Sequence, residues 1–152
     1  MIITEQTKRA IPFKPGDAKR VGEGCFYMDH IVWLNGEHIE LDDGVGFNYG
    51  CYVNGMGGLV VGEGTIFGPY TMIHTANHKT DDLTRPIPEQ GWEDTPPVQI
   101  GPQCWIGMGV CILPGVRIGE GCVIGAGTVL TTDLDAYTVA AGNPAEPVKS
   151  RR

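Results

Sequence analysis

The stretch VQIGPQCWIGMGVCILPGVRIGEGCVIGAGTVL, residues 98–130, carries a bulky aliphatic residue at every sixth position. These positions are Ile100, Ile106, Ile112, Ile118, Ile124 and Leu130. The same spacing occurs upstream in two further runs, at Leu41, Phe47 and Val53 and at Val61, Phe67 and Ile73. A period of six fits neither an α-helix nor a flat β-strand. A fixed hexad repeat is instead typical of a parallel β-helix.

The other hexad positions support this interpretation. Glycine directly follows many of the bulky positions, and more glycines fall three residues after them. Glycine adopts positive φ without a steric penalty, so it suits the corner that ends each hexad. Two residues before the bulky position the chain has small or β-branched residues, such as Cys104, Val110 and Thr128, which fit a narrow interior. Three hexads would then make one triangular coil of about 18 residues.

We therefore expect one all-β domain over residues 1–152, with a parallel β-helix of about four coils at residues 41–133. Residues 1–40 show only a weak hexad signal and are predicted to form an N-terminal cap. The repeat is interrupted at residues 77–97, NHKTDDLTRPIPEQGWEDTPP, which predicts one long loop. Long loops on a rigid scaffold usually carry function. Residues 134–152 form the expected C-terminal tail.

Composition narrows the class of protein. The chain has 11 Lys and Arg against 18 Asp and Glu, and its formal net charge of −7 argues against non-specific nucleic-acid binding. No apolar run is long enough for a transmembrane helix, so we expect no membrane insertion. The N-terminal residues lack the apolar stretch of a signal peptide. Three of the five cysteines occupy inward hexad positions and are expected to be reduced, which favours a cytoplasmic location.

The run PVQIGPQCWIGMGVCILPGVRIGEGCVIGAGTVLTTDLDAYTVAAGNPAEPVK, with the segment TANHKTDD before it, resembles the hexapeptide-repeat acetyltransferases. The chain is similar to galactoside, maltose and polysaccharide O-acetyltransferases and to xenobiotic acetyltransferases over about residues 44–149. The resemblance implies a left-handed parallel β-helix, acetyl-CoA as cosubstrate and no metal. It also implies an acyltransferase that acetylates a sugar or polysaccharide hydroxyl, on a small-molecule or glycan acceptor. The implied assembly is a homotrimer with active sites between protomers.

The resemblance also assigns the catalytic groups. His78, in the long loop, matches the family's histidine that removes a proton from the acceptor hydroxyl. Histidine suits this role because its pKa lies close to neutral pH. Asn48 and the backbone N–H of Met108 match two donors that hold the developing oxyanion. His74, just before the loop, and Trp92, within it, are candidates for binding the acceptor.

By the same resemblance, coenzyme A lies along the last coils. Its predicted contacts are Trp105, Gly107, Ala126 and Thr131, with Lys149, Arg151 and Arg152 near the phosphates. Three positions depart from the family pattern. Thr132 stands where a lysine is common, and Glu146 stands where an arginine is frequent. Gly46 stands where the family often has an acceptor-binding aromatic residue, which argues against a simple galactoside or maltose acceptor.

The sequence leaves three alternatives open. A xenobiotic or amino-sugar N-acetyltransferase would use the same fold and loop. A zinc hydratase resembling the γ-class carbonic anhydrases would need three histidine ligands, of which His74 and His78 could supply two. The last alternative is a non-catalytic β-helix used in assembly. His30 and His38 fall in the expected cap and are interpreted as structural.

Overall fold

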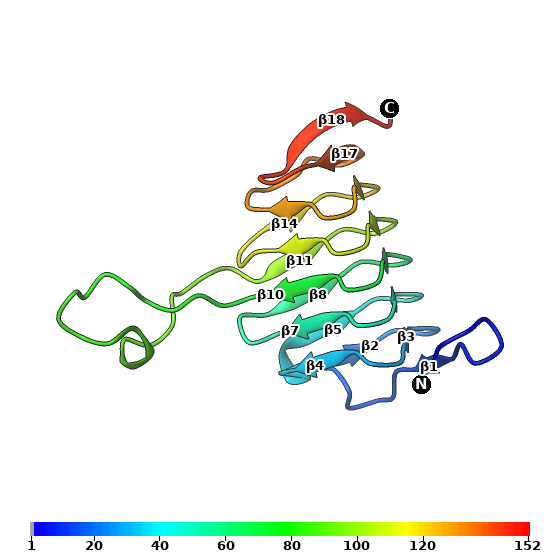
Figure 1. Ribbon diagram of the computed structural model, residues 1–152, viewed down its shortest axis with the longest axis horizontal. Coiled ribbons are helices and arrows are strands. Elements are labelled where there is room, and N and C mark those ends of the chain that lie inside the picture. The colour runs from blue at the N-terminus through cyan, green and yellow to red at the C-terminus, as the bar shows by residue number, and fades with distance from the viewer. Residues whose placement is uncertain (1) are drawn as a thin grey trace.

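The computed structural model describes residues 2–152 and shows a parallel β-helix whose strands stack in three sheets (Figure 1). The predicted all-β class and parallel β-helix are confirmed. The helices among residues 2–152 are two three-residue 3₁₀ turns, η1 at Gly36–His38 and η2 at Ile87–Glu89. In this part of the chain no helix has the length and apolar character needed to cross a membrane.

We name the sheets A, B and C. Sheet B holds the first strand of each coil, namely β2 (Arg20–Val21), β5 (Ile39–Leu41), β8 (Leu59–Val61), β11 (Val98–Ile100) and β14 (Arg117–Ile118). Sheet A comes next in each coil and contains β1 (Ala10–Pro12), β3 (Phe26–Met28), β6 (Gly46–Phe47), β9 (Ile66–Phe67), β12 (Trp105–Ile106), β15 (Val123–Ile124), β17 (Thr138–Ala141) and β18 (Glu146–Ser150). Sheet C completes each coil with β4 (Val32–Leu34), β7 (Tyr52–Asn54), β10 (Met72–His74), β13 (Cys111–Ile112) and β16 (Val129–Leu130).

The turns between sheets form the edges of a triangular prism. We call the turn from sheet A to sheet C the A–C edge, and the turn from sheet C to the next strand of sheet B the C–B edge. Strands within a sheet pair in parallel and in register, apart from β1 and β18, which pair antiparallel. Equivalent turn residues of successive coils therefore lie in columns along each edge, spaced by about 4.8 Å.

The interior is filled by the bulky hexad residues. All twelve positions identified from the sequence are at most 3 % exposed, which confirms the predicted phase. Phe47 and Phe67 stack face to face with their ring centroids 4.4 Å apart. Burying one such side chain contributes about 1.5–3 kcal/mol. Polar atoms at the small inward positions are satisfied locally, as where the Thr128 hydroxyl donates to the Gly125 carbonyl at 2.7 Å.

The inward cysteines behave as small core residues. All five cysteines within residues 2–152 are free thiols. Burial raises the pKa of Cys51 to about 11. The pKa of Cys104 is raised as well, first by its hydrogen bond with Cys122 and then by burial, whereas the same hydrogen bond lowers the pKa of Cys122. A thiol with a raised pKa stays neutral and is a poor nucleophile at neutral pH.

The structure has more coils than the four predicted. Strands β2, β3 and β4 already form a complete coil, and β17 still pairs in parallel with β15. The β-helix therefore contains five full coils and a partial sixth. The first coil lies inside residues 1–40, the segment expected to be a cap. Its inward residues Val21, Tyr27 and Trp33 keep the period of six, but two of them are polar-tipped aromatics, so the hexad signal is weak there.

Phe13 closes the N-terminal end of the prism. Its ring lies 4.8 Å from those of Tyr27 and Trp33 and 6.0 Å from that of Phe47, between centroids. The Trp33 indole N–H donates to the Asp17 carbonyl at 2.8 Å. This segment supplies the cover that a terminal repeat needs. The capping function is therefore confined to the residues before β2.

Ile112→Ala should lower the free energy of unfolding by about 2–5 kcal/mol, because it leaves a cavity in the interior. Ile112 is fully buried on β13. Gln99→Ala is the control, because Gln99 points outward from β11 and its loss should change stability by less than about 0.5 kcal/mol. Denaturant unfolding at fixed protein concentration measures both. If both variants lost the same unfolding free energy, the assignment of Ile112 to the interior and Gln99 to the surface would be wrong.

Candidate functional site

Asn48 and Met108 line one hollow at the A–C edge, with a volume of about 350 Å³. Most of its wall is apolar and extends over the outer face of sheet A. There Ile66 and Trp105 are 47 % and 57 % exposed. Two of the three predicted catalytic residues are therefore brought to one place, next to the predicted cofactor residue Trp105.

Both residues have a hydrogen-bond donor available. The Asn48 Oδ1 accepts a hydrogen bond from the Tyr49 N–H at 2.8 Å, which orients the amide and leaves its NH₂ group without a partner in residues 2–152. The Met108 N–H also donates no hydrogen bond within the described residues, although the N–H groups of Gly107 and Gly109 on either side are both used. Preorganised donors of this kind stabilise a negatively charged oxygen.

Gly68 lies directly against the backbone nitrogen of Met108. It occupies the coil between Asn48 and Met108, and a Cβ at this position would lie 2.7 Å from the Met108 nitrogen. Any side chain there would have to displace the Met108 backbone. Gly62, Gly101 and Gly119 approach the backbone of the next coil equally closely, so this contact is a general feature of the turns.

His78 lies on residues 77–97, which we call the arm. The arm leaves the C–B edge after β10 and returns before β11, and Figure 1 shows it projecting far from the β-helix. In the same view the arm leaves on the left, whereas β3 of sheet A lies on the right. Within one protomer, the structure therefore does not bring His78 to Asn48 and Met108.

The His78 ring is held by Trp92. The two residues face each other in an antiparallel bridge, and their rings stack with centroids 4.0 Å apart. The Lys79 N–H donates to the Gly91 carbonyl at 3.0 Å, which ties the two limbs of the arm together. The Trp92 ring is thus occupied on one face by the imidazole, and its predicted contact with the acceptor stays a prediction.

The tip of the arm is ordered by Gln90 and Asp82. The Gln90 side chain accepts from the Asp82 N–H and donates to the carbonyls of Asp82 and Arg85. The Asp82 carboxylate accepts from the Thr84 hydroxyl and N–H, which lowers the pKa of Asp82. Among residues 2–152 no acidic side chain hydrogen-bonds to His78, so the stack with Trp92 is its orienting contact.

The predicted coenzyme A residues also divide between two edges. Gly107 and Ala126 lie on the A–C edge, and Trp105 lies on the adjoining face of sheet A. Thr131 follows β16 and lies on the C–B edge, from which the arm also leaves. The predicted catalytic residues and the predicted cofactor residues are thus divided between the same two edges.

The C-terminal segment with the basic residues Lys149, Arg151 and Arg152 leads away from the A–C edge. Strand β18 pairs antiparallel with β17 and carries the chain back across sheet A. The Arg151 guanidinium donates to the Gly121 carbonyl at 2.6 Å, and that of Arg152 lies 3.8 Å from the centre of the Tyr137 ring. Both arginines thus have intramolecular contacts, while Lys149 is exposed.

His74 points outward from β10 in sheet C, with its ring 6.4 Å from that of Tyr52. It does not share a hollow with Asn48 or Met108. Within residues 2–152 no three His, Cys, Asp or Glu side chains gather as a metal-binding group. The three histidines of a zinc hydratase would therefore have to come from more than one protomer.

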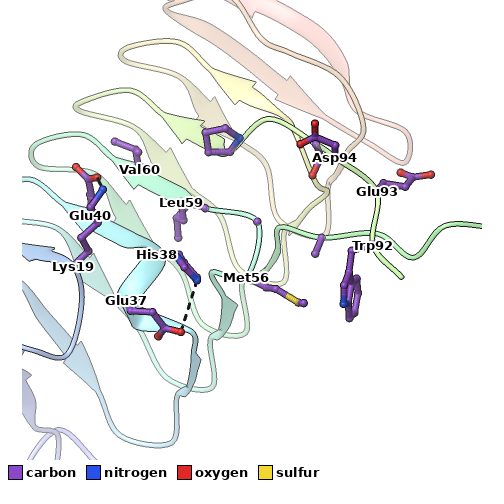
Figure 2. Close-up of a pocket in the computed structure, with 15 residues that line it drawn as sticks. Lys19, Glu37, His38, Glu40, Met56, Leu59, Val60, Trp92, Glu93 and Asp94 are labelled. Atoms are coloured by element: carbon purple, nitrogen blue, oxygen red, sulfur yellow. Dashed lines mark hydrogen bonds and ion pairs between the residues drawn. The ribbon is translucent and has the colours of Figure 1, made fainter. Parts of the chain in front are cut away.

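A further groove of about 570 Å³ lies between the base of the arm and the outer face of sheet B (Figure 2). Figure 2 shows Trp92 and Glu93 at one end and Glu40 with Lys19 at the other. Glu40 pairs with Lys19 at 2.7 Å, in an exposed ion pair of little energetic value. The groove contains neither of the two donors, so we place the candidate site at the A–C edge.

Comparison with known proteins identifies the family. A family model described as "Bacterial transferase hexapeptide (six repeats)" matches residues 97–132. The galactoside O-acetyltransferase of Lactococcus lactis is 34 % identical over 125 residues, a match that covers 82 % of this chain and 59 % of that protein. The chain spans about half to two thirds of the length of the first curated relatives that it matches.

Solved structures agree with this match. A maltose O-acetyltransferase of Clostridium difficile is 32 % identical with a TM-score of 0.77, over 88 % of this chain and 70 % of that one. A hexapeptide-repeat acetyltransferase of Vibrio cholerae, solved with acetyl coenzyme A, is 26 % identical with a TM-score of 0.75, over 89 % of this chain and 72 % of that one. The chain belongs to the hexapeptide-repeat acetyltransferase family, as its sequence predicted.

Trp92→Ala should loosen the arm, because an aromatic stack of this kind contributes about 0.5–1.5 kcal/mol. Trypsin cleavage after Lys79 should then become faster by roughly two- to tenfold. Leu83→Ala is the control, since Leu83 is 96 % exposed on the same arm. Timed proteolysis followed by mass spectrometry measures the rates. An unchanged rate in Trp92→Ala would contradict an ordering role for the stack.

Proposed function

We propose that the protein transfers an acetyl group from acetyl-CoA to a sugar or glycan hydroxyl, in sites formed between the protomers of a homotrimer. The pair of free donors, the Asn48 NH₂ group and the Met108 N–H, carries this proposal because both border one hollow. The galactoside and maltose O-acetyltransferases among the relatives support a sugar acceptor. The Vibrio cholerae structure supports acetyl-CoA as the donor.

In this proposal His78 acts as the general base. The acceptor oxygen attacks the thioester carbonyl carbon, a C–O bond forms, and His78 takes the hydroxyl proton. The C–S bond then breaks, and the proton passes to the departing thiolate of coenzyme A. General base catalysis typically contributes about 10²–10⁴-fold. Trp92 keeps the imidazole in place through the ring stack.

The two donors hold the oxygen on which negative charge develops. The Asn48 amide is fixed by the Tyr49 N–H, so its NH₂ group needs little reorganisation during the reaction. The backbone donor at Met108 is fixed by the hydrogen bonds of its neighbours. Removing one donor of this type typically costs about 10²–10³-fold in kcat.

The C-terminal part of the A–C edge suits the pantetheine arm of coenzyme A. A Cβ at Gly109 or Gly127 would meet nothing within 4 Å, so no neighbouring atom covers the backbone at these two turns. Ala126 is exposed beside it. An extended ligand can therefore approach the backbone closely, from Ala126 to the Met108 N–H. Trp105 offers an exposed ring next to this path.

The outer face of sheet C suits the interior of a trimer. Its central row contains no charged side chain and consists of Val32, Tyr52, Met72, Cys111 and Val129. The corresponding row of sheet B is mostly charged or polar, with Arg20, Glu40, Val60, Gln99 and Arg117. Uncharged surface of this kind is normally buried in assemblies.

A threefold arrangement would also complete the site. The A–C edge and the C–B edge are the two borders of sheet C. If sheet C faces the axis, cyclic symmetry brings the A–C edge of each protomer to the C–B edge of the next. His78 and Thr131 of one protomer would then meet Asn48, Met108 and Ala126 of its neighbour.

His78→Ala should lower kcat by about 10²–10⁴-fold and leave folding and acetyl-CoA binding intact. Thiol release from acetyl-CoA with sugar acceptors measures kcat. The rise in Tm should persist, since a ligand at 100 times its Kd adds about 2.7 kcal/mol to stability. His38→Ala is the control, because His38 lies on η1, off the arm, and is exposed. Near-normal turnover in His78→Ala would refute the proposed mechanism.

A further inference from the structure

A hollow of about 650 Å³ lies on the A–C edge, on the N-terminal side of Met108. It is lined by Ile3, His30, Tyr49, Gly50, Pro69, Tyr70 and Met108. Pro69 and Met108 also line the hollow that contains Asn48, so the two hollows adjoin. The sequence assigned no site to His30, Tyr49 or Tyr70, and none of their side chains has a part in the proposed acetyl transfer.

His30 and Tyr70 stand where this edge otherwise has glycine. The equivalent residues of the five coils are His30, Gly50, Tyr70, Gly109 and Gly127. All five have φ between 59° and 70°. Bulky side chains are uncommon in this left-handed region and carry a strain cost. The edge therefore bears two exposed rings on the N-terminal side of Met108, and bare glycine backbone on the C-terminal side.

The Tyr49 side chain lines the same hollow, but its hydroxyl group is buried. Its hydroxyl oxygen is shielded from solvent and has no hydrogen-bond partner within residues 2–152. A buried hydroxyl without a partner is costly, so such a group needs an explanation. Tyr49 is the counterpart of Met108 two coils earlier, which places it along the line of the proposed reaction site.

The lining has the chemistry of a sugar site. Tyr70 and His30 each present an exposed flat ring with a polar tip, and Tyr49 adds a ring whose hydroxyl is buried. No Asp, Glu, Lys or Arg lines the hollow. A pyranose ring presents an apolar C–H face and a rim of hydroxyls, which match such rings and tips. Sites of this kind bind neutral ligands through apolar surface and a few placed polar groups.

We propose that this hollow is a second sugar subsite, so that the acceptor is a glycan of at least two rings. The ring that is acetylated lies beside Asn48 and Met108, and the neighbouring ring lies against Tyr70 and His30. This inference rests on the proposed acetyl transfer, with coenzyme A on the C-terminal side of Met108. The N-terminal side of the edge is then the free approach for the acceptor.

Tyr70→Gly tests the subsite with little risk to folding, because glycine adopts the required φ without strain. Gln103→Gly is the matched control. Gln103 also has positive φ, at 57°, and packs over a glycine of the preceding coil, as Tyr70 does. It lies outside both hollows. The two variants therefore make the same backbone change, and only one removes a ring from the proposed subsite.

Calorimetric titration of the coenzyme A-loaded protein should compare maltose, lactose and chitobiose with glucose, galactose and N-acetylglucosamine. At least one disaccharide should bind about tenfold more tightly than its monosaccharide. Tyr70→Gly should raise the Kd of that disaccharide by about tenfold, and Gln103→Gly should leave it as in the wild type. His30→Gly should weaken disaccharide binding in the same direction.

Three results would overturn the subsite. The first is that no disaccharide binds more tightly than its monosaccharide, and the second is that Gln103→Gly loses as much disaccharide affinity as Tyr70→Gly. The third is that the Tyr70→Gly trimer dissociates in light scattering, which would show that a neighbouring protomer fills the hollow. Thiol release separates this inference from the proposed function. Acetyl transfer without a disaccharide preference would remove the subsite alone. Disaccharide binding that depends on Tyr70, without any acetyl transfer, would support the subsite and remove the proposed reaction.

Discussion

The hydrogen-bonded stacking of one coil on the next, in register, is the constraint on which the structure depends. Because each coil repeats the backbone of the one before it, a turn residue always lies on its counterpart one coil away. This is why Gly68 lies directly against the Met108 backbone, and why the Asn48 side chain reaches the hollow that Met108 also lines. Each edge becomes a column of sites whose character changes with the side chain that each coil supplies.

The same regularity explains why His78 lies away from Asn48 and Met108 within one chain. A straight prism presents its edges in different directions, and the arm projects outward from the C–B edge, away from the A–C edge of its own chain (Figure 1). The proposed symmetry solves this by placing one protomer's arm against the next protomer's donors. The uncharged face of sheet C then serves assembly, while sheet B keeps its charged face in water.

The sequence predicted the class of fold and the inward phase, because a period of six aliphatic residues has one structural explanation. It missed the first coil, where Tyr27 and Trp33 replace aliphatic residues beneath the Phe13 cover. The catalytic and cofactor residues came from family resemblance, since spacing alone does not distinguish a functional turn from a structural one. The free N–H of Met108, the reversal of the tail at β18 and the buried Tyr49 hydroxyl depend on contacts between coils.

The most direct test of a site shared between protomers is complementation between two inactive variants. His78→Ala and Asn48→Ala would be expressed separately and together, and thiol release would be measured per protomer at equal trimer content. If each site takes its base from one protomer and its amide donor from the next, random mixing should restore about a quarter of the sites. If the mixture is no more active than the separate variants, although mixed trimers have formed, the site is not shared between protomers.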